Sequence, residues 1–205
     1  MRITEVKPSS HRKGRWLIRM EDGTLLQVSE REIVDFSLCR GMELTGETRA
    51  RLEQAAKLGS YREKAMSLLT NRPMSRAELT KKLVDRGAEG DEAGGVADWL
   101  ERLGLLDDAA YAQILVRHYT AKGYGPYRLR NELYRRGVPR ELWEQAMACC
   151  EDPAEQIDAF LARRLRGVEP DRKALKRVSD ALARRGFRWS DINAGLRRYG
   201  ATDEF

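Results

Sequence analysis

The chain has 205 residues, of which 34% are charged, 41% are hydrophobic and only 7% are aromatic. It is long enough to bury a core, either as one or two ordinary domains or as several small units. The net charge of +6 and pI near 9.3 favour an anionic partner, but 38 basic residues against 32 acidic ones exclude a polycation. This composition favours many small helices with solvated outer faces over a sheet-rich fold.

The first part of the chain, residues 1–58, is predicted to be a small β-rich module. Arg2–Val6 and Trp16–Met20 have the pattern of strands. Asp22-Gly23, followed by the apolar stretch Thr24–Val28, is a strong hairpin signal. The loop between the first two strands contains three cations that we expect to lie in a solvated turn: Arg12, Lys13 and Arg15.

The module is expected to continue with a helix and an edge strand. Ser29 and Glu32 are spaced as a capping box, which predicts a short helix over Ser29–Ser37. Gly41–Leu44 is predicted to return as a short edge strand. We expect this module to pack on the helical body rather than to form a separate active domain.

From Thr48 onward, apolar residues recur at the helical period. The stretch RLEQAAKL leads into a helix over Tyr61–Asn71, and Ser75 with Glu78 forms a second capping box. The further helices are predicted over Ser75–Arg86, Asp91–Leu103, two segments on either side of Gly123-Tyr124-Gly125, Pro139–Cys150, Ile157–Arg166, Arg172–Arg185 and Trp189–Tyr199.

The helical part repeats with a period near 50 residues. Gly87, Gly137 and Gly186 each follow an arginine, and the apolar positions keep the same spacing: Leu79, Leu129 and Val178, then Leu83, Leu133 and Leu182. This pattern is typical of a repeat array in which each unit packs against its neighbours. The predicted fold is mainly α, an elongated array of three tandem three-helix repeats after the β module. The expected divisions are 1–58, 59–106, 107–151 and 152–205.

The most informative stretch runs from Asp107 to Gly137. Asp107 or Asp108 can cap a first helix, and Pro126 suits the first turn of a second. In the second helix two leucines form a buried seam, and the opposite side carries arginines bordered by Tyr127 and Tyr134. From Arg117 to Arg136 there are six Lys or Arg and one acid, Glu132. This concentration of charge predicts a positive surface on a rigid support.

The same stretch resembles the RecX family, the regulators of the bacterial RecA recombinase. Many positions match at fixed offsets, which makes the resemblance specific. It extends upstream and covers roughly residues 61–147 well. The matching residues are Asp108, Tyr111, Ala112, Gly123, Gly125, Pro126, Arg128, Glu132, Leu133, Arg136 and Gly137, with Arg72, Ser75, Glu78, Leu79 and Leu83 upstream. The resemblance implies tandem three-helix repeats that bind in the helical groove of the RecA filament on DNA.

Catalytic chemistry is not indicated by any motif. His11 and His118 are the only histidines, and we expect His118 to pack on the inward side of its helix. Trp99, Trp143 and Trp189 are expected to fill cores. We predict a non-enzyme with no catalytic residue, no cofactor and no metal.

The cysteines Cys39, Cys149 and Cys150 have neither a metal-ligand spacing nor a usual disulfide geometry. We interpret them as reduced thiols, which favours a cytoplasmic protein. No apolar run approaches the roughly 20 residues of a membrane span, and the sequence begins without a signal peptide's apolar region. No membrane association is therefore expected, and we expect a monomer.

Charge arranged by helical geometry supplies the candidate binding site. For Arg86, Arg136 and Arg185 a helix-capping role is preferred, because they flank the buried seam. The first repeat is nearly neutral, with eight basic and eight acidic residues between Tyr61 and Leu106. The expected contacts with filament or DNA are Lys122, Arg128, Arg130, Arg135, Lys173, Lys176, Arg177 and Arg184.

The resulting hypothesis is a regulator that binds the RecA nucleoprotein filament, with single- or double-stranded DNA among its contacts. The resemblance implies that it inhibits recombinase, ATPase and coprotease activity and so modulates DNA repair and the SOS response. One alternative is a helical-repeat nucleic-acid-binding protein or transcriptional regulator that acts without RecA. Another is an adaptor that binds RecA equally with or without DNA.

Overall fold

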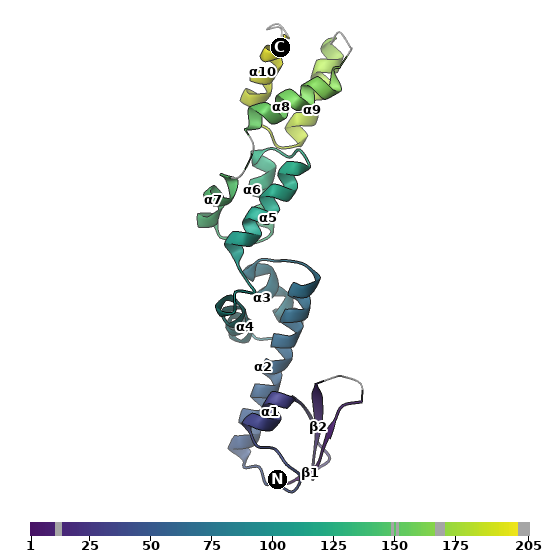
Figure 1. The fold of residues 1–205 in the computed structure, drawn as a ribbon, viewed down its shortest axis with the longest axis vertical. Helices are drawn as coiled ribbons and strands as arrows, with labels where there is room; N and C mark the ends of the chain where they lie inside the picture. Colours follow the sequence, from purple (N-terminus) through teal and green to yellow (C-terminus); the bar gives the residue numbers. More distant parts are fainter. Residues whose placement is uncertain (11–13, 149, 151, 167–170, 201–205) are drawn as a thin grey trace. The chain divides into compact units, whose positions relative to one another are not determined.

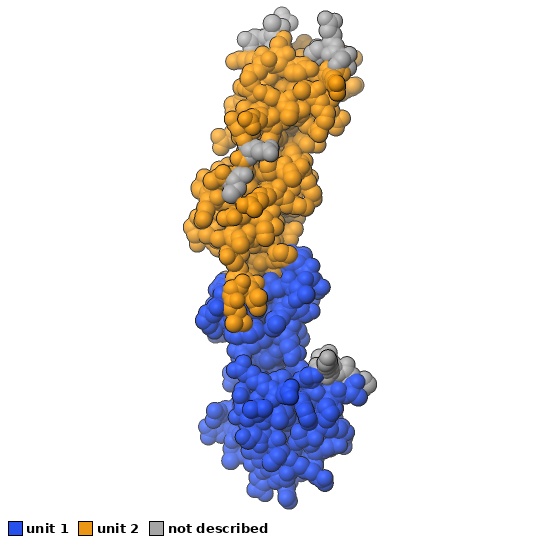
Figure 2. All heavy atoms as spheres, viewed as in Figure 1, with its two compact units in different colours: residues 1–72, 79–102 blue, residues 73–78, 103–205 orange. Residues whose placement is uncertain are grey.

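A computed structural model of the chain describes residues 1–10, 14–148, 150, 152–166 and 171–200. Expectations that concern His11, Arg12, Lys13 and Cys149 lie outside the described residues. The chain divides into two compact units, coloured separately in Figure 2: residues 1–72 with 79–102, and residues 73–78 with 103–205.

Helices dominate both units, as the composition predicts, and a small sheet is confined to the N-terminal module (Figure 1). The predicted fold class, mainly α repeats after a β module, is confirmed. In chain order the described elements are β1 (Ile3–Pro8), β2 (Arg15–Met20), β3 (Leu25–Ser29), α1 (Glu30–Asp35), α2 (Gly46–Asn71), α3 (Arg76–Val84), α4 (Gly90–Arg102), α5 (Asp108–Ala121), α6 (Pro126–Arg135), η1 (Arg140–Leu142), α7 (Trp143–Met147), α8 (Pro153–Arg164), α9 (Arg172–Arg184) and α10 (Trp189–Arg198).

The N-terminal module is a three-stranded antiparallel sheet in the order β1-β2-β3. The predicted hairpin is confirmed: Gly23 has φ +85°, and the Asp22 carboxylate accepts from the Thr24 amide at 2.9 Å. Ile18 and Met20 alternate into a core that α2 completes with Leu52. The capping box at α1 is also confirmed, because the Glu32 carboxylate accepts from the Ser29 amide at 2.6 Å.

Two expectations for this module are wrong. Arg15 is not solvated but only 4% exposed, and its Nη2 lies 2.7 Å from Oε2 of Glu63 on α2. The partner is 48 residues away in sequence, so local spacing could not reveal it. Gly41–Leu44 forms no strand, because its bridge pairing is limited to Glu43 with Arg2.

The helical part of unit 1 is built on α2, which runs unbroken for 26 residues from its N-cap Thr45. Tyr61 on this helix donates its hydroxyl to the Gly87 carbonyl at 2.6 Å. Leu83 at the end of α3 and Leu100 at the end of α4 are fully buried. The long helix therefore belongs both to the β module and to the first repeat.

Unit 2 contains two three-helix groups, each with its own hydrophobic core. The first group, α5, α6 and α7, buries Leu115, Leu129 and Leu133, and the second, α8, α9 and α10, buries Ile157 and Leu182, among others. Local capping residues begin these helices. Asp107 caps α5, Asp152 caps α8 and Asp171 caps α9, while Pro126 and Pro153 occupy first helical turns.

Three expectations within unit 2 are wrong. His118 is exposed rather than inward, and its ring makes an edge contact with Tyr119 at 5.3 Å between centroids. Trp189 is 55% exposed, because it occupies the first position of α10. The helix predicted over Pro139–Cys150 is shorter, a 3-10 turn followed by α7.

The sequence period corresponds to equivalent structural positions. All six repeated apolar residues are buried, and Gly87, Gly137 and Gly186 have φ of +90°, +65° and +89°. Each glycine thus ends its helix in the left-handed conformation that side chains disfavour. Among the described residues, no helix is both long and apolar enough to cross a membrane.

Candidate nucleic-acid interface

The outer side of α6 combines aromatic and cationic side chains. Tyr127 and Tyr134 are 66% and 67% exposed and are seven residues apart. Seven residues are two helical turns, so the two rings share one side at a separation of about 10 Å along the axis. Arg130 and Asn131 fall between them. The exposed tyrosines therefore lie beside arginines of α6, as the sequence predicts.

The lone acid of this stretch is not a surface residue. Glu132 is only 5% exposed, and its Oε1 lies 3.3 Å from Nη1 of Arg135 and 3.6 Å from Nε of Arg128. A buried carboxylate is costly unless it is paired. Glu132 therefore holds two of the expected contact arginines in place and neutralises part of their charge.

The third arginine of α6 has a partner on the next helix. Nη2 of Arg130 lies 3.3 Å from Oε1 of Glu144, whose side chain is strongly exposed. An exposed pair of this kind contributes little to stability and is easily exchanged for another anion. Of the three arginines, Arg135 has the most exposed side chain, at 69%, against 43% for Arg128 and 36% for Arg130.

Lys122 lies at the C-cap of α5, apart from the outer side of α6, but aromatic rings connect it to Arg128. Its ammonium is 5.6 Å from the centroid of Tyr119, which is 5.6 Å from that of Tyr124, and the Arg128 guanidinium is 5.4 Å from Tyr124. Cations over aromatic faces are attracted by the ring quadrupole. The structure therefore brings Lys122 and Arg128 to the two ends of one aromatic pair.

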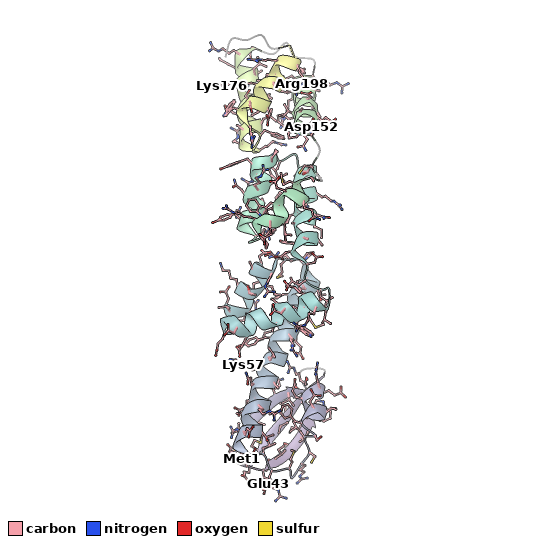
Figure 3. All side chains as sticks on the ribbon, turned by 90° about the vertical axis from the view of Figure 1, so that its left-hand side faces the viewer. Met1, Glu43, Lys57, Asp152, Lys176 and Arg198 are labelled. Carbon is pink, nitrogen blue, oxygen red and sulfur yellow. The ribbon has the colours of Figure 1, made fainter. Side chains whose placement is uncertain are left out.

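The four expected contacts on α9 share one side of the helix. Lys173, Lys176 (Figure 3), Arg177 and Arg184 are exposed, and none forms an ion pair with another described residue. Half-buried Asp180 falls on the same side and reduces its charge. Four cations against one acid leave α9 the less neutralised of the two basic helices.

The arginine-glycine steps do more than cap helices. Arg86 donates to the carbonyl of Lys82 on its own helix at 3.0 Å, which fits the predicted capping role. Arg136 instead donates to Glu78 at 3.1 Å, and Arg185 donates to the Gly123 carbonyl at 3.3 Å. Within unit 2, these two arginines therefore reach residues that belong to the preceding repeat of the sequence.

The backbone at both steps is also engaged. The Ser75 hydroxyl donates to the Arg136 carbonyl, and the amides of Gly125 and Tyr127 donate to the carbonyls of Arg185 and Gly186 at 2.9 and 3.1 Å. Ser75 and Gly125 are 50 residues apart, so equivalent positions dock on equivalent turns. The period of the sequence contained this signal, but only the coordinates identify the partners.

Metal binding finds no support in the described part of the chain, where no three His, Cys, Asp or Glu residues come together as ligands. Cys39 is exposed, and Cys150 is half-buried with its sulfur 3.7 Å from the Thr120 hydroxyl. The fold and these surfaces define a helical-repeat protein made of small three-helix domains.

Comparison with known proteins identifies the family. The model of the first three-helix domain of RecX matches residues 62–100, and that of the second matches residues 107–147. The chain is similar to "Regulatory protein RecX" of Xanthomonas axonopodis pv. citri (strain 306), with 37% identity over 137 residues, which are 66% of this chain and 85% of the relative. Its namesake from Halorhodospira halophila is 33% identical over 154 residues, 74% of this chain and 96% of the relative. The chain belongs to the RecX family of regulatory proteins.

Solved structures show the same fold. A crystal structure of regulatory protein RecX superposes with a TM-score of 0.73 at 24% identity, covering 96% of this chain and 98% of that one. The crystal structure of RecX from Lactobacillus salivarius gives 0.62 at 20% identity, with 71% and 97% coverage. The similarity to the first of these crystal structures extends beyond the two domains matched by the family models and covers nearly the whole chain.

Proposed function

We propose that this protein regulates the RecA recombinase by binding in the groove of the RecA-DNA filament. Membership of the RecX family is the observation that carries the proposal. Bound in the groove, the chain obstructs strand exchange and filament growth, which lowers recombinase, ATPase and coprotease activity and so modulates DNA repair and the SOS response. The regulator acts by occupancy and carries out no bond chemistry.

The cationic sides of α6 and α9 support the choice of partner. A DNA backbone and an acidic protein surface both attract lysine and arginine, and each phosphate contact releases condensed counterions. Exposed tyrosines such as Tyr127 and Tyr134 suit either base stacking or a protein contact. Two linked basic helices bind a long polymer more tightly than either alone, because the second contact is intramolecular.

The domain divisions at residues 58, 106 and 151 belong to the same proposal. Each repeat would contribute one weak contact, and the β module would extend the first. We expect the chain to act as a monomer in the cytoplasm, where RecA filaments form.

One titration tests the function directly. The protein is added to RecA on single-stranded DNA, and filament ATPase, filament binding and binding to bare DNA are measured together. We expect ATPase to fall in parallel with filament binding, at concentrations where bare DNA is mostly free. Equal binding to RecA with and without DNA would instead indicate an adaptor.

The contact assignment on α6 is tested by reversing its charge. We expect Arg128→Glu, Arg130→Glu and Arg135→Glu together to weaken filament binding and inhibition by at least about tenfold, because like charges then face the phosphates. Circular dichroism checks that the helical content persists. The matched control reverses three exposed cations of unit 1, Arg40, Arg51 and Lys81. Unchanged inhibition in the α6 variant would discard the assignment.

A RecA-independent nucleic-acid-binding protein is the second candidate, and the exposed cations of α9 favour it. Such a protein would bind bare DNA as tightly as the filament. Its binding would depend steeply on salt and little on sequence. The same titration therefore separates the two functions.

A further inference from the structure

A hollow within unit 2 carries positive charge that the α6 and α9 surfaces do not include. It has a volume of about 280 Å³ and opens between the C-terminal end of α5 and helix α8. Its wall includes Lys122 and Gly123 from one side and Gln156, Phe160, Arg163 and Arg185 from the other. Pockets that enclose whole ligands are larger, roughly 300–1,000 Å³. The hollow therefore suits one chemical group of a ligand.

The charge of the wall has one sign. Lys122, Arg163 and Arg185 are cationic, and none of the ten residues that form the wall is acidic. Neither Lys122 nor Arg163 forms an ion pair with another described residue. Like charges around one hollow repel one another, and an anion bound there relieves that repulsion.

The two arginines are held by one aromatic ring. The guanidinium carbons of Arg185 and Arg163 lie 4.8 and 5.7 Å from the centroid of Phe160, which is itself buried. Arg185 is fixed further by its 3.3 Å hydrogen bond to the Gly123 carbonyl. Planar guanidinium groups with several free donors match the oxygens of a phosphate. The ring thus orients two such groups at one hollow.

The amide of Gln156 adds an unused polar group to the wall. Its Oε1 is buried without a hydrogen-bond partner among the described residues. Oxygen and nitrogen of a glutamine amide exchange places by a half-turn, which converts this acceptor into a donor. In either orientation the amide keeps two N–H donors, so Gln156 can donate to an anion without repacking of the helix.

We propose that this hollow binds a phosphate group, with Lys122, Arg163 and Arg185 as its ligands and Gln156 as an additional donor. This site adds to the proposed function a phosphate contact that the surfaces of α6 and α9 lack. Where the phosphate belongs to DNA, the inference rests on that proposed function. The source of the phosphate is either the backbone of a DNA strand or a free phosphate-bearing molecule. Both present the same oxygens to the same cations.

The chain provides a closely matched pair of variants. Arg163→Gln removes a charge from the hollow, whereas Arg164→Gln removes one from the adjacent residue, which is also 5.7 Å from the Phe160 centroid but does not contribute to the wall. Both residues are exposed and lie in the last turn of α8, so their effects on folding should be similar. Lys122→Gln tests the opposite wall.

The first measurement uses the full chain without RecA. Nuclear magnetic resonance follows the arginine Nε–H signals while inorganic phosphate or a short single-stranded oligonucleotide is added. We expect the signals of Arg163 and Arg185 to shift and that of Arg164 to stay in place. Shifts with either probe support the site, and their relative strength identifies the source. If neither probe shifts the signals of Arg163 and Arg185, the proposed site is rejected.

The second measurement is the salt dependence of oligonucleotide binding. For DNA as the source, Arg163→Gln and Lys122→Gln should each lower the slope of log K against log salt by about 0.7, the value for one single-strand phosphate contact. Arg164→Gln should keep the slope of the natural protein. If Arg163→Gln and Arg164→Gln lower the slope by the same amount, the hollow is rejected as a DNA contact. Because RecA is absent, these outcomes are separable from failure of the proposed regulation.

Discussion

Single glycines determine how closely segments of unit 2 approach one another. Gly186 has φ +89°, and a Cβ added there would lie 2.5 Å from the Arg128 amide nitrogen. A Cβ on Gly125 would lie 2.6 Å from the Gly186 carbonyl oxygen. The two glycines thus allow two backbones to meet where a larger residue could not fit. Glycine is required by contact at both positions, and at Gly186 also by its left-handed conformation.

Gly186→Ala should therefore destabilise unit 2 more than Gly87→Ala destabilises unit 1. At Gly87 the conformation is the same, but the nearest atom to an added Cβ is the Tyr61 hydroxyl at 3.9 Å. We expect Gly87→Ala to cost about 1–2 kcal/mol from the left-handed backbone alone. Gly186→Ala should cost about 2–5 kcal/mol, because overpacking is added.

Amide hydrogen exchange can resolve this difference locally. The amides of Gly125 and Tyr127, which donate to the Arg185 and Gly186 carbonyls, should lose protection in Gly186→Ala and keep it in Gly87→Ala. Equal loss of stability in the two variants would mean that the close approach contributes nothing.

A second residue-scale prediction concerns pH. The Lys57 ammonium lies 2.8 Å from the Glu92 carboxylate, and the Glu89 amide donates to the same carboxylate at 2.9 Å. These hydrogen bonds hold the pKa of Glu92 below its ordinary value of 4.5. Because the folded-state pKa is the lower one, the pair stabilises the fold above about pH 4.5 and loses that effect as pH falls through the folded value.

Carboxyl NMR titration measures the Glu92 midpoint directly. We expect a midpoint below 4.5 in the natural protein and a rise toward 4.5 in Lys57→Met, because the largest contribution comes from the lysine. Lys64→Met, two turns further along α2, should leave the Glu92 midpoint in place. A Lys57→Met midpoint equal to that of the natural protein would contradict this assignment.

At the scale of elements, α6 and α9 occupy equivalent places in their repeats but carry their charge differently. The arginines of α6 are partly neutralised by Glu132 and Glu144. The cations of α9 form no ion pair with another described residue, and half-buried Asp180 falls on their side of the helix. We therefore expect α9 to supply the larger share of phosphate contacts, and α6, with its exposed tyrosines, to supply the more selective ones.

Replacing Lys173, Lys176, Arg177 and Arg184 by alanine tests this division of roles. At about 0.7 for each single-strand phosphate contact, the slope of log K against log salt should fall by about 3. Alanine favours helices, so α9 should persist. The matched control removes four exposed charges from unit 1 at Arg40, Arg51, Lys81 and Arg102 and should keep the slope. Equal slopes in the two variants would show that net charge alone controls binding.

At the scale of the whole molecule, the fold is stabilised by several separate hydrophobic cores rather than by one. The β module and the two three-helix groups of unit 2 each bury their own set of apolar side chains. Small domains with separate cores tolerate differences in outer surface, because each fold depends on its own seam. One repeated architecture can therefore carry basic helices such as α6 and α9 beside a nearly neutral first repeat.

Much of this architecture was determined by the sequence alone. The helix starts at Asp107, Pro126, Asp152 and Asp171 follow from local capping chemistry, and the period of the apolar residues predicts the repeats. The exposure of the α6 and α9 cations was also predictable, because the helical period separates them from the buried leucines. Their role in binding stays a prediction.

Only the tertiary structure decided which distant residues meet. It placed Arg15 against Glu63, buried Glu132 between two arginines, exposed His118 and Trp189, and brought Arg163 to the same hollow as Lys122. The physical reason is range: capping and periodicity act over one or two helical turns, which sequence spacing records. Burial and charge pairing depend on how helices pack, and spacing along the chain does not contain that information.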